Sequence, residues 1–146
     1  MRFRKMLICV LTSLLCLGIF CPTAADAAQT PQEFVKEFYE WYIIKHYEHH
    51  AILKEEKLPE CVDASLIEEL EKKGPSDIYY FIHYGSNTLA FKDCRIVVKD
   101  ALKMSDDVFV VPVIFKGKKF ESTVIAYVKK VDSVFKIASV SDVYPY

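Results

Sequence analysis

The chain has 146 residues, 52% of them hydrophobic and 27% charged, with a formal net charge of −1. This balance excludes the basic surface expected of a nucleic-acid-binding protein, and the large apolar share excludes a disordered chain. A chain of this length is expected to fold as one domain around a modest core.

The first 27 residues have the pattern of a secretory signal peptide. Residues 1–5 carry three basic side chains, and residues 6–20 form an uncharged apolar run, which is shorter than the roughly 20 residues of a membrane span. Ala25 and Ala27 then provide the small side chains that a signal peptidase accepts. We predict cleavage after Ala27, which leaves residues 28–146 as a single exported α+β domain with a charge of 16 minus 19, or −3.

A lipoprotein is the alternative product, because Cys16 and Cys21 lie where a lipid-modified cysteine would be found. Lipoprotein signals need a small residue directly before that cysteine, whereas here Leu15 and Phe20 precede the two cysteines. No second apolar run of spanning length follows, so we expect the mature chain to have no transmembrane anchor. The predicted location is the periplasm or the surrounding medium.

Cys61 and Cys94 are the only cysteines after residue 27. An even pair in an oxidising compartment is typical of a disulfide, which would contribute about 3 to 4 kcal/mol for a loop of this length. A thiol nucleophile is the alternative, and it would need a base beside it. We predict that Cys61 is bonded to Cys94.

Residues 31–50 predict a long helix. Thr30 is a candidate N-cap, Pro31 stands at the first helical position, and Glu33 completes a capping box. Large aromatic side chains recur at the i, i+4, i+7, i+8 spacing of one helix face, namely Phe34, Phe38, Trp41 and Tyr42. We expect this stripe, with Trp41 as a core anchor, to be enclosed by a curved sheet.

The rest of the chain predicts one more helix and then strands. Residues 63–73 have a helical apolar face that Gly74 and Pro75 end. From residue 93 onward, four β-branched runs are separated by short turns, which favours an antiparallel meander. The runs are residues 93–104, 108–115, 120–131 and 133–144.

The second of these runs stands apart from the other three. Both of its alternating sets of residues are apolar, which predicts a central strand covered on both faces. Pro112 within it predicts a bulge or a locally unpaired edge, because proline cannot donate to the ladder.

The expected fold class is α+β, with N-terminal helices packed on a curved four-stranded antiparallel sheet in a cone-like shape. With FVKEFYEWYI in the first helix and FKIASV near the end, the chain resembles a family of small exported bacterial domains of unknown function. These domains are built on the nuclear-transport-factor-2-like or cystatin-like superfold. The resemblance implies a pocket but no particular chemistry, since members of the superfold include isomerases, dehydratases and binding modules.

Three of the four histidines cluster at the end of the first predicted helix, at His46, His49 and His50. The i, i+4 pair of His46 and His50 can place two imidazoles on one metal ion. Two ligands from one helix make half a site, and the sequence identifies no third. The alternative is a solvated helix end, where imidazoles favour the negative pole of the helix dipole. We predict no tight metal site and expect no cofactor.

A second cluster, formed by Asp77, Tyr80, His83 and Tyr84, is a candidate ligand pocket. A histidine beside an aspartate and tyrosines can act as a general acid or base near neutral pH. In the alternative interpretation, the tyrosines wedge against the sheet and the histidine hydrogen-bonds a backbone carbonyl.

Three functions follow from this sequence. The leading hypothesis is a non-enzymatic binding module of the cell envelope that holds a small apolar ligand or a protein partner. The alternatives are a small pocket enzyme of isomerase or hydratase type, and a periplasmic immunity or inhibitor protein that plugs a toxin's active site. An inhibitor needs an exposed loop, for which residues 49–62 and 142–146 are candidates, whereas a pocket needs an open space between the first helix and the sheet.

Overall fold

The computed structural model describes five stretches of the chain, which are residues 29–48, 51–74, 79–83, 91 and 93–142. The signal peptide and its cleavage site lie outside these residues and stay predictions. The candidate residues His50, Asp77 and Tyr84 lie outside them as well. In the stretches that are described, no helix is both long enough and apolar enough to cross a membrane.

Helix α1 spans Pro31–Tyr47 and begins at the predicted capping box. The Glu33 backbone N–H donates to the Thr30 hydroxyl at 3.2 Å, and the Thr30 backbone N–H donates to the Glu33 carboxylate at 2.8 Å. These reciprocal bonds satisfy backbone donors that have no partner within the helix. The predicted start of the helix is therefore confirmed.

Three shorter helical segments follow, namely η1 (Ile52–Lys54), α2 (Leu58–Cys61) and α3 (Ala64–Lys73). Asp63 caps α3, because its side chain accepts a hydrogen bond from the Ser65 backbone N–H at 3.1 Å. Gly74 ends α3 with a φ of 84°, a conformation that favours glycine. The second predicted helix is thus confirmed, with its first residue acting as the cap.

The strands form one antiparallel sheet of five members rather than the four predicted. They are β1 (Arg95–Val98), β2 (Leu102–Lys103), β3 (Val108–Lys116), β4 (Glu121–Val131) and β5 (Val134–Asp142). The sheet order is β1-β3-β4-β5, and the short β2 also pairs with β3. The first predicted run is therefore split into two strands along one side of β3, and the α+β class is confirmed.

Pro112 lies in β3 at the gap between β1 and β2. Its carbonyl accepts the Lys99 backbone N–H at 2.9 Å, so the missing N–H of Pro112 also faces this gap. Pairing of Pro112 with Ile125 of β4 continues on the other side. Pro112 therefore stands where the neighbouring strand is interrupted, and its carbonyl keeps one hydrogen bond there although the residue has no N–H to donate.

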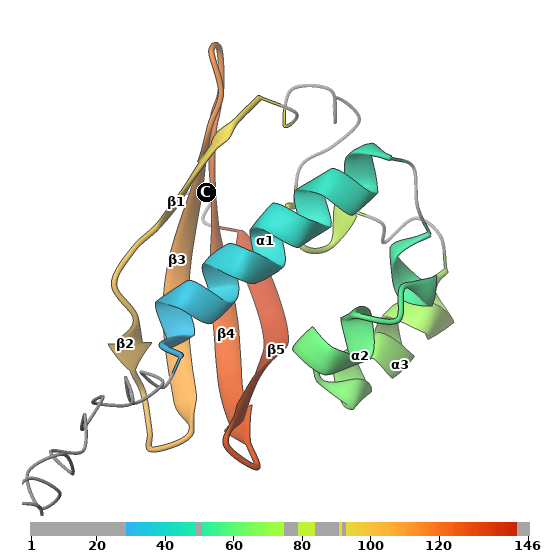
Figure 1. The fold of residues 1–146 in the computed structure, drawn as a ribbon, viewed down its shortest axis with the longest axis vertical. Helices are drawn as coiled ribbons and strands as arrows, with labels where there is room; N and C mark the ends of the chain where they lie inside the picture. Colours follow the sequence, from blue (N-terminus) through green and yellow to red (C-terminus); the bar gives the residue numbers. More distant parts are fainter. Residues whose placement is uncertain (1–28, 49–50, 75–78, 84–90, 92, 143–146) are drawn as a thin grey trace, which may run out of the picture.

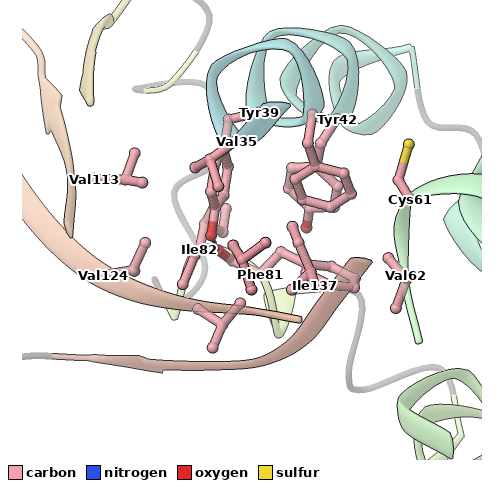
Figure 2. Close-up of a cluster of buried hydrophobic side chains, with 14 of the residues drawn as sticks. Val35, Tyr39, Tyr42, Cys61, Val62, Phe81, Ile82, Val113, Val124 and Ile137 are labelled. Carbon is pink, nitrogen blue, oxygen red and sulfur yellow. Dashed lines mark hydrogen bonds between the residues drawn. The ribbon is translucent and has the colours of Figure 1, made fainter. Parts of the chain in front are cut away.

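Helix α1 lies on one face of the sheet and crosses in front of the strands, whereas α2 and α3 lie beside the edge strand β5 (Figure 1). Val35 and Tyr39 of α1 point toward Val113 and Val124 of the sheet (Figure 2). On this face the β3 side chains Val111, Val113 and Phe115 are fully buried, whereas the alternate β3 residues stay partly exposed. The predicted cover on both faces is therefore wrong for the part of the chain that the structure describes, although β3 is central as expected.

Aromatic rings fill the space between α1 and the sheet. Phe38 is 1% exposed, and its ring centroid lies 5.2 Å from Tyr39 and 5.2 Å from Phe81. The Tyr42 ring lies 5.3 Å from Phe81 and is itself fully buried. These rings occupy the space in which the leading hypothesis places a small apolar ligand.

Trp41 is not the core anchor that its place in the aromatic stripe predicts. It is only partly buried, with its ring 5.8 Å from Phe38 and the Lys57 ammonium 5.7 Å from its centroid. Tyr39 and Tyr42 take the central positions, both at 0% exposure. The buried face of α1 is turned away from Trp41, which lies at the rim of the core.

Candidate functional site

Tyr80 and His83, two of the predicted pocket residues, face the edge strand β5. The Val140 backbone N–H donates to the Tyr80 hydroxyl at 3.1 Å, and His83 Nε2 lies 3.1 Å from the Val140 carbonyl oxygen. Because a carbonyl only accepts, this contact assigns the proton of His83 to Nε2. The arrangement matches the alternative interpretation, in which tyrosine packs on the sheet and histidine binds the backbone.

Residues just before α3 also contact the free edge of β5, through its backbone and through the Lys136 side chain. The Asp63 backbone N–H donates to the Ile137 carbonyl at 2.9 Å, and Val62 forms a parallel bridge with Ile137. The Lys136 ammonium reaches the Pro59 and Glu60 carbonyls, each at 2.6 Å. This edge of the sheet is therefore occupied by contacts within the chain, and Tyr80 and His83 share that role.

The buried tyrosines of α1 also have structural roles. The Tyr39 hydroxyl donates to the Phe81 carbonyl at 2.9 Å. Burial raises the pKa of Tyr39 well above its usual value, and burial likewise raises the pKa of Tyr42. Both phenols therefore stay neutral at physiological pH, which does not suit a general acid or base.

His46 packs among aromatic rings and is 8% exposed. Tyr42 stacks on its imidazole at 5.7 Å, and the Tyr79 ring meets it edge-on at 5.4 Å. Among the residues that the structure describes, no group of three metal-ligating side chains is gathered in one place. The solvated helix end that the sequence offered as the alternative is wrong for His46, because this histidine belongs to the core.

Cys61 and Cys94 are both free cysteines, so the predicted disulfide is not formed in the structure. Cys61 ends α2, which lies beside β5, and Cys94 directly precedes β1 at the opposite edge of the sheet. A disulfide needs Cα atoms within about 7 Å of each other, and two strands separate these edges. Burial raises the pKa of each thiol, which is opposite to the activation that a nucleophile needs.

The face of the sheet opposite the helices, called the open face below, is rich in apolar side chains. They include Val97, Leu102, Val110, Pro112, Ile114, Ile125 and Tyr127. Leu102 is 61% exposed and Tyr127 is 37% exposed. A contiguous apolar surface of this kind is typical of protein contact sites.

The β3–β4 hairpin ends in a basic turn, residues 116–119, which we call the lysine tip. Lys116 forms an ion pair with Glu121 at 3.1 Å, whereas Lys118 and Lys119 are exposed and form no ion pair within the described stretches. The Gly117 backbone N–H donates to the Phe120 carbonyl at 2.9 Å and closes the turn. The hairpin projects beyond the helices and β1 at one end of the molecule (Figure 1).

Comparison with known proteins gives one informative similarity. No protein-family model matches the chain, and no curated protein matches its sequence. The fold is similar to a chain in the crystal structure of the type VI native effector-immunity complex Tae3-Tai3 from Ralstonia pickettii, with a TM-score of 0.68 and 27% sequence identity. The match covers 80% of this chain and 98% of that chain, so the similarity concerns a whole domain.

Sequence reasoning missed both exposed surfaces. In residues 108–115 the side chains that point to either face of the strand are apolar, which indicates the open face. The same pattern also fits a strand that is buried on both sides. The lysine tip reads as an ordinary polar turn in the sequence. Its projection depends on the lengths of β3 and β4, which only the paired sheet defines.

Proposed function

We propose that this chain is an immunity protein that binds an effector protein and blocks its activity. The similarity to a chain of an effector-immunity complex carries the proposal, because it extends over 98% of that neighbour. A whole-domain similarity favours a shared kind of partner more than a short motif would. A protein partner also suits the apolar side chains of the open face.

The immunity role is favoured over the effector role because the candidate reactive side chains are engaged in the fold. An effector that acts as an enzyme needs accessible acid–base or nucleophilic groups. In this chain His83 and Tyr80 bind the backbone of Val140, and burial raises the pKa of the Cys61 thiol. These groups support the fold, and an inhibitor needs only a surface that fits its target.

The proposed site of action is the periplasm. Residues 1–27 have the pattern of a signal peptide, and export would place the inhibitor where an incoming effector can be met. The intact mass of the exported protein tests this part of the proposal. We expect the mature chain to begin at Ala28 or within two residues of it, and a mass that still includes residues 1–27 would contradict export with cleavage.

Competition between strains tests the function itself. In a bacterium that encodes this chain, deletion of its gene should make cells sensitive to contact with the parent strain. Sensitivity should vanish when type VI secretion of the parent is inactivated, and the full-length chain should restore protection. A version without residues 1–27 should not restore it. Equal survival of the deletion strain and the parent in contact would reject the proposed function.

A further inference from the structure

We propose that the lysine tip enters an acidic recess on the effector. The inference rests on the proposed function and adds the surface that makes the contact and the chemistry of the partner. Neither of the loop segments offered by the sequence, residues 49–62 and 142–146, includes this hairpin.

The hairpin is built to carry its tip away from the body of the protein. Cross-strand pairing of β3 and β4 continues to Lys116 and Glu121, the last residues of the two strands. The tip therefore projects on a paired ribbon, past β1 and the helices (Figure 1). A ribbon that is already ordered loses little conformational freedom when it enters a recess.

The base of the tip is held by aromatic packing. The Phe120 ring lies 4.9 Å from Phe91, and Phe91 lies 5.3 Å from the fully buried Phe115. Gly117 lies directly on the Phe120 ring, and a Cβ at this position would be 2.0 Å from that ring. Glycine thus permits a close approach that fixes the shape of the turn and leaves the neighbouring lysines exposed.

Two of the three lysines of the tip have no ion-pair partner among the described residues, in a chain whose formal net charge is −1. On the helices, Lys36, Lys72 and Lys73 each pair with a carboxylate four residues away. Lys118 and Lys119 form no ion pair with any residue that the structure describes. Two exposed ammonium groups on an ordered turn complement a carboxylate-lined recess, where opposite charges steer encounter and set the register of the complex.

An anionic membrane surface would offer negative charge, as an acidic protein recess does, but the lysine tip fits a membrane less well. Segments that bind acidic lipids carry about four to eight basic residues. The tip has three lysines, and Lys116 is already paired with Glu121. A protein recess is therefore the partner that we infer.

The deletion strain described above, supplied with full-length variants, tests the inference. K118E/K119E reverses the charge of the tip, K118R/K119R keeps the charge, and K72E/K73E makes the same charge change on α3. We expect wild type, K118R/K119R and K72E/K73E to restore survival, and K118E/K119E to lose protection at equal amounts of folded protein. If K118E/K119E has a lower melting temperature than wild type, K118Q/K119Q replaces it in the comparison.

The outcomes separate the two proposals. Full protection by K118E/K119E overturns the role of the tip and leaves the immunity function standing, whereas failure of the wild-type chain to protect rejects both. An equal loss in K72E/K73E traces the effect to net charge and also overturns the inference. Binding of the purified chain to phosphatidylglycerol vesicles that K118E/K119E abolishes, with protection retained, would reassign the tip to a membrane surface.

Discussion

The two faces of the sheet are made by the same strands from similar apolar residues, yet their surroundings differ. On the side of the sheet that α1 covers, Val111 and Val113 of β3 are fully buried. On the open face, Val110 and Ile114 of the same strand stay partly exposed, and Tyr127 beside them is 37% exposed. The stability of the domain should therefore come mainly from one face, which leaves the other face free to serve binding.

The largest expected effect is at Phe38, which is 1% exposed and contacts four aromatic rings. Phe38→Ala should lower the free energy of unfolding by about 3 to 5 kcal/mol, as is usual for a buried aromatic. Tyr127→Ala on the open face is the matched control and should cost far less. Denaturant unfolding of both variants measures the difference, and equal losses would mean that the open face is covered in solution.

A milder pair of variants compares the faces within one strand. Val113→Thr places a hydroxyl in the fully buried layer and should cost about 1 to 3 kcal/mol, because a buried polar group lacks a partner there. Val110→Thr makes the same change on the open face, where water can reach the hydroxyl, and surface changes of this kind usually cost within about 0.5 kcal/mol. Thermal or denaturant melts of the two variants decide the comparison. A larger loss for Val110→Thr would reverse the assignment of the faces.

The smallest expected effect tests whether water reaches the buried Tyr39 hydroxyl on the side of the sheet that α1 covers. Tyr39→Phe removes the hydroxyl that donates to the Phe81 carbonyl, and it should cost about 1 to 2 kcal/mol at neutral pH. Burial raises the pKa of Tyr39 in the folded state, so its contribution is complete below the unfolded pKa of about 10 and is lost as pH rises above that value.

Unfolding free energies measured between neutral pH and pH 11 should therefore fall less steeply for Tyr39→Phe than for wild type. A Tyr39→Phe profile parallel to wild type would show that water reaches this hydroxyl.

Local features of the fold were predictable because they depend on neighbouring residues. The Thr30 capping box and the turns between strands each need only a few adjacent side chains. Pro112 likewise marks an irregularity in the pairing of its strand, since the missing N–H acts wherever the strand is placed.

Features decided by distant contacts were not predictable in the same way. Trp41 and Tyr39 are both large and aromatic, and only the docking of α1 on the sheet determines which of them is central. The sequence predicts a disulfide between Cys61 and Cys94, but the sheet order places the two cysteines at opposite edges. For the candidate site, the Tyr80 and His83 rings lie 5.5 Å apart, but the partner of both side chains is the backbone of Val140, which lies about 60 residues away in the chain.

The contacts that cover the β5 edge determine how late in the chain folding can be completed. The contacts of Tyr80 and His83 with Val140 join residues 60 and 57 positions apart, and Lys136 reaches Pro59 over 77 positions. Contacts of such long sequence separation form slowly, because a large loop must close before any of them is made. The helices come first in the chain, but the sheet that buries them is complete only when the final strand has been added. A chain that crosses an export channel from its N-terminus would thus lack a complete core until almost all of it has crossed.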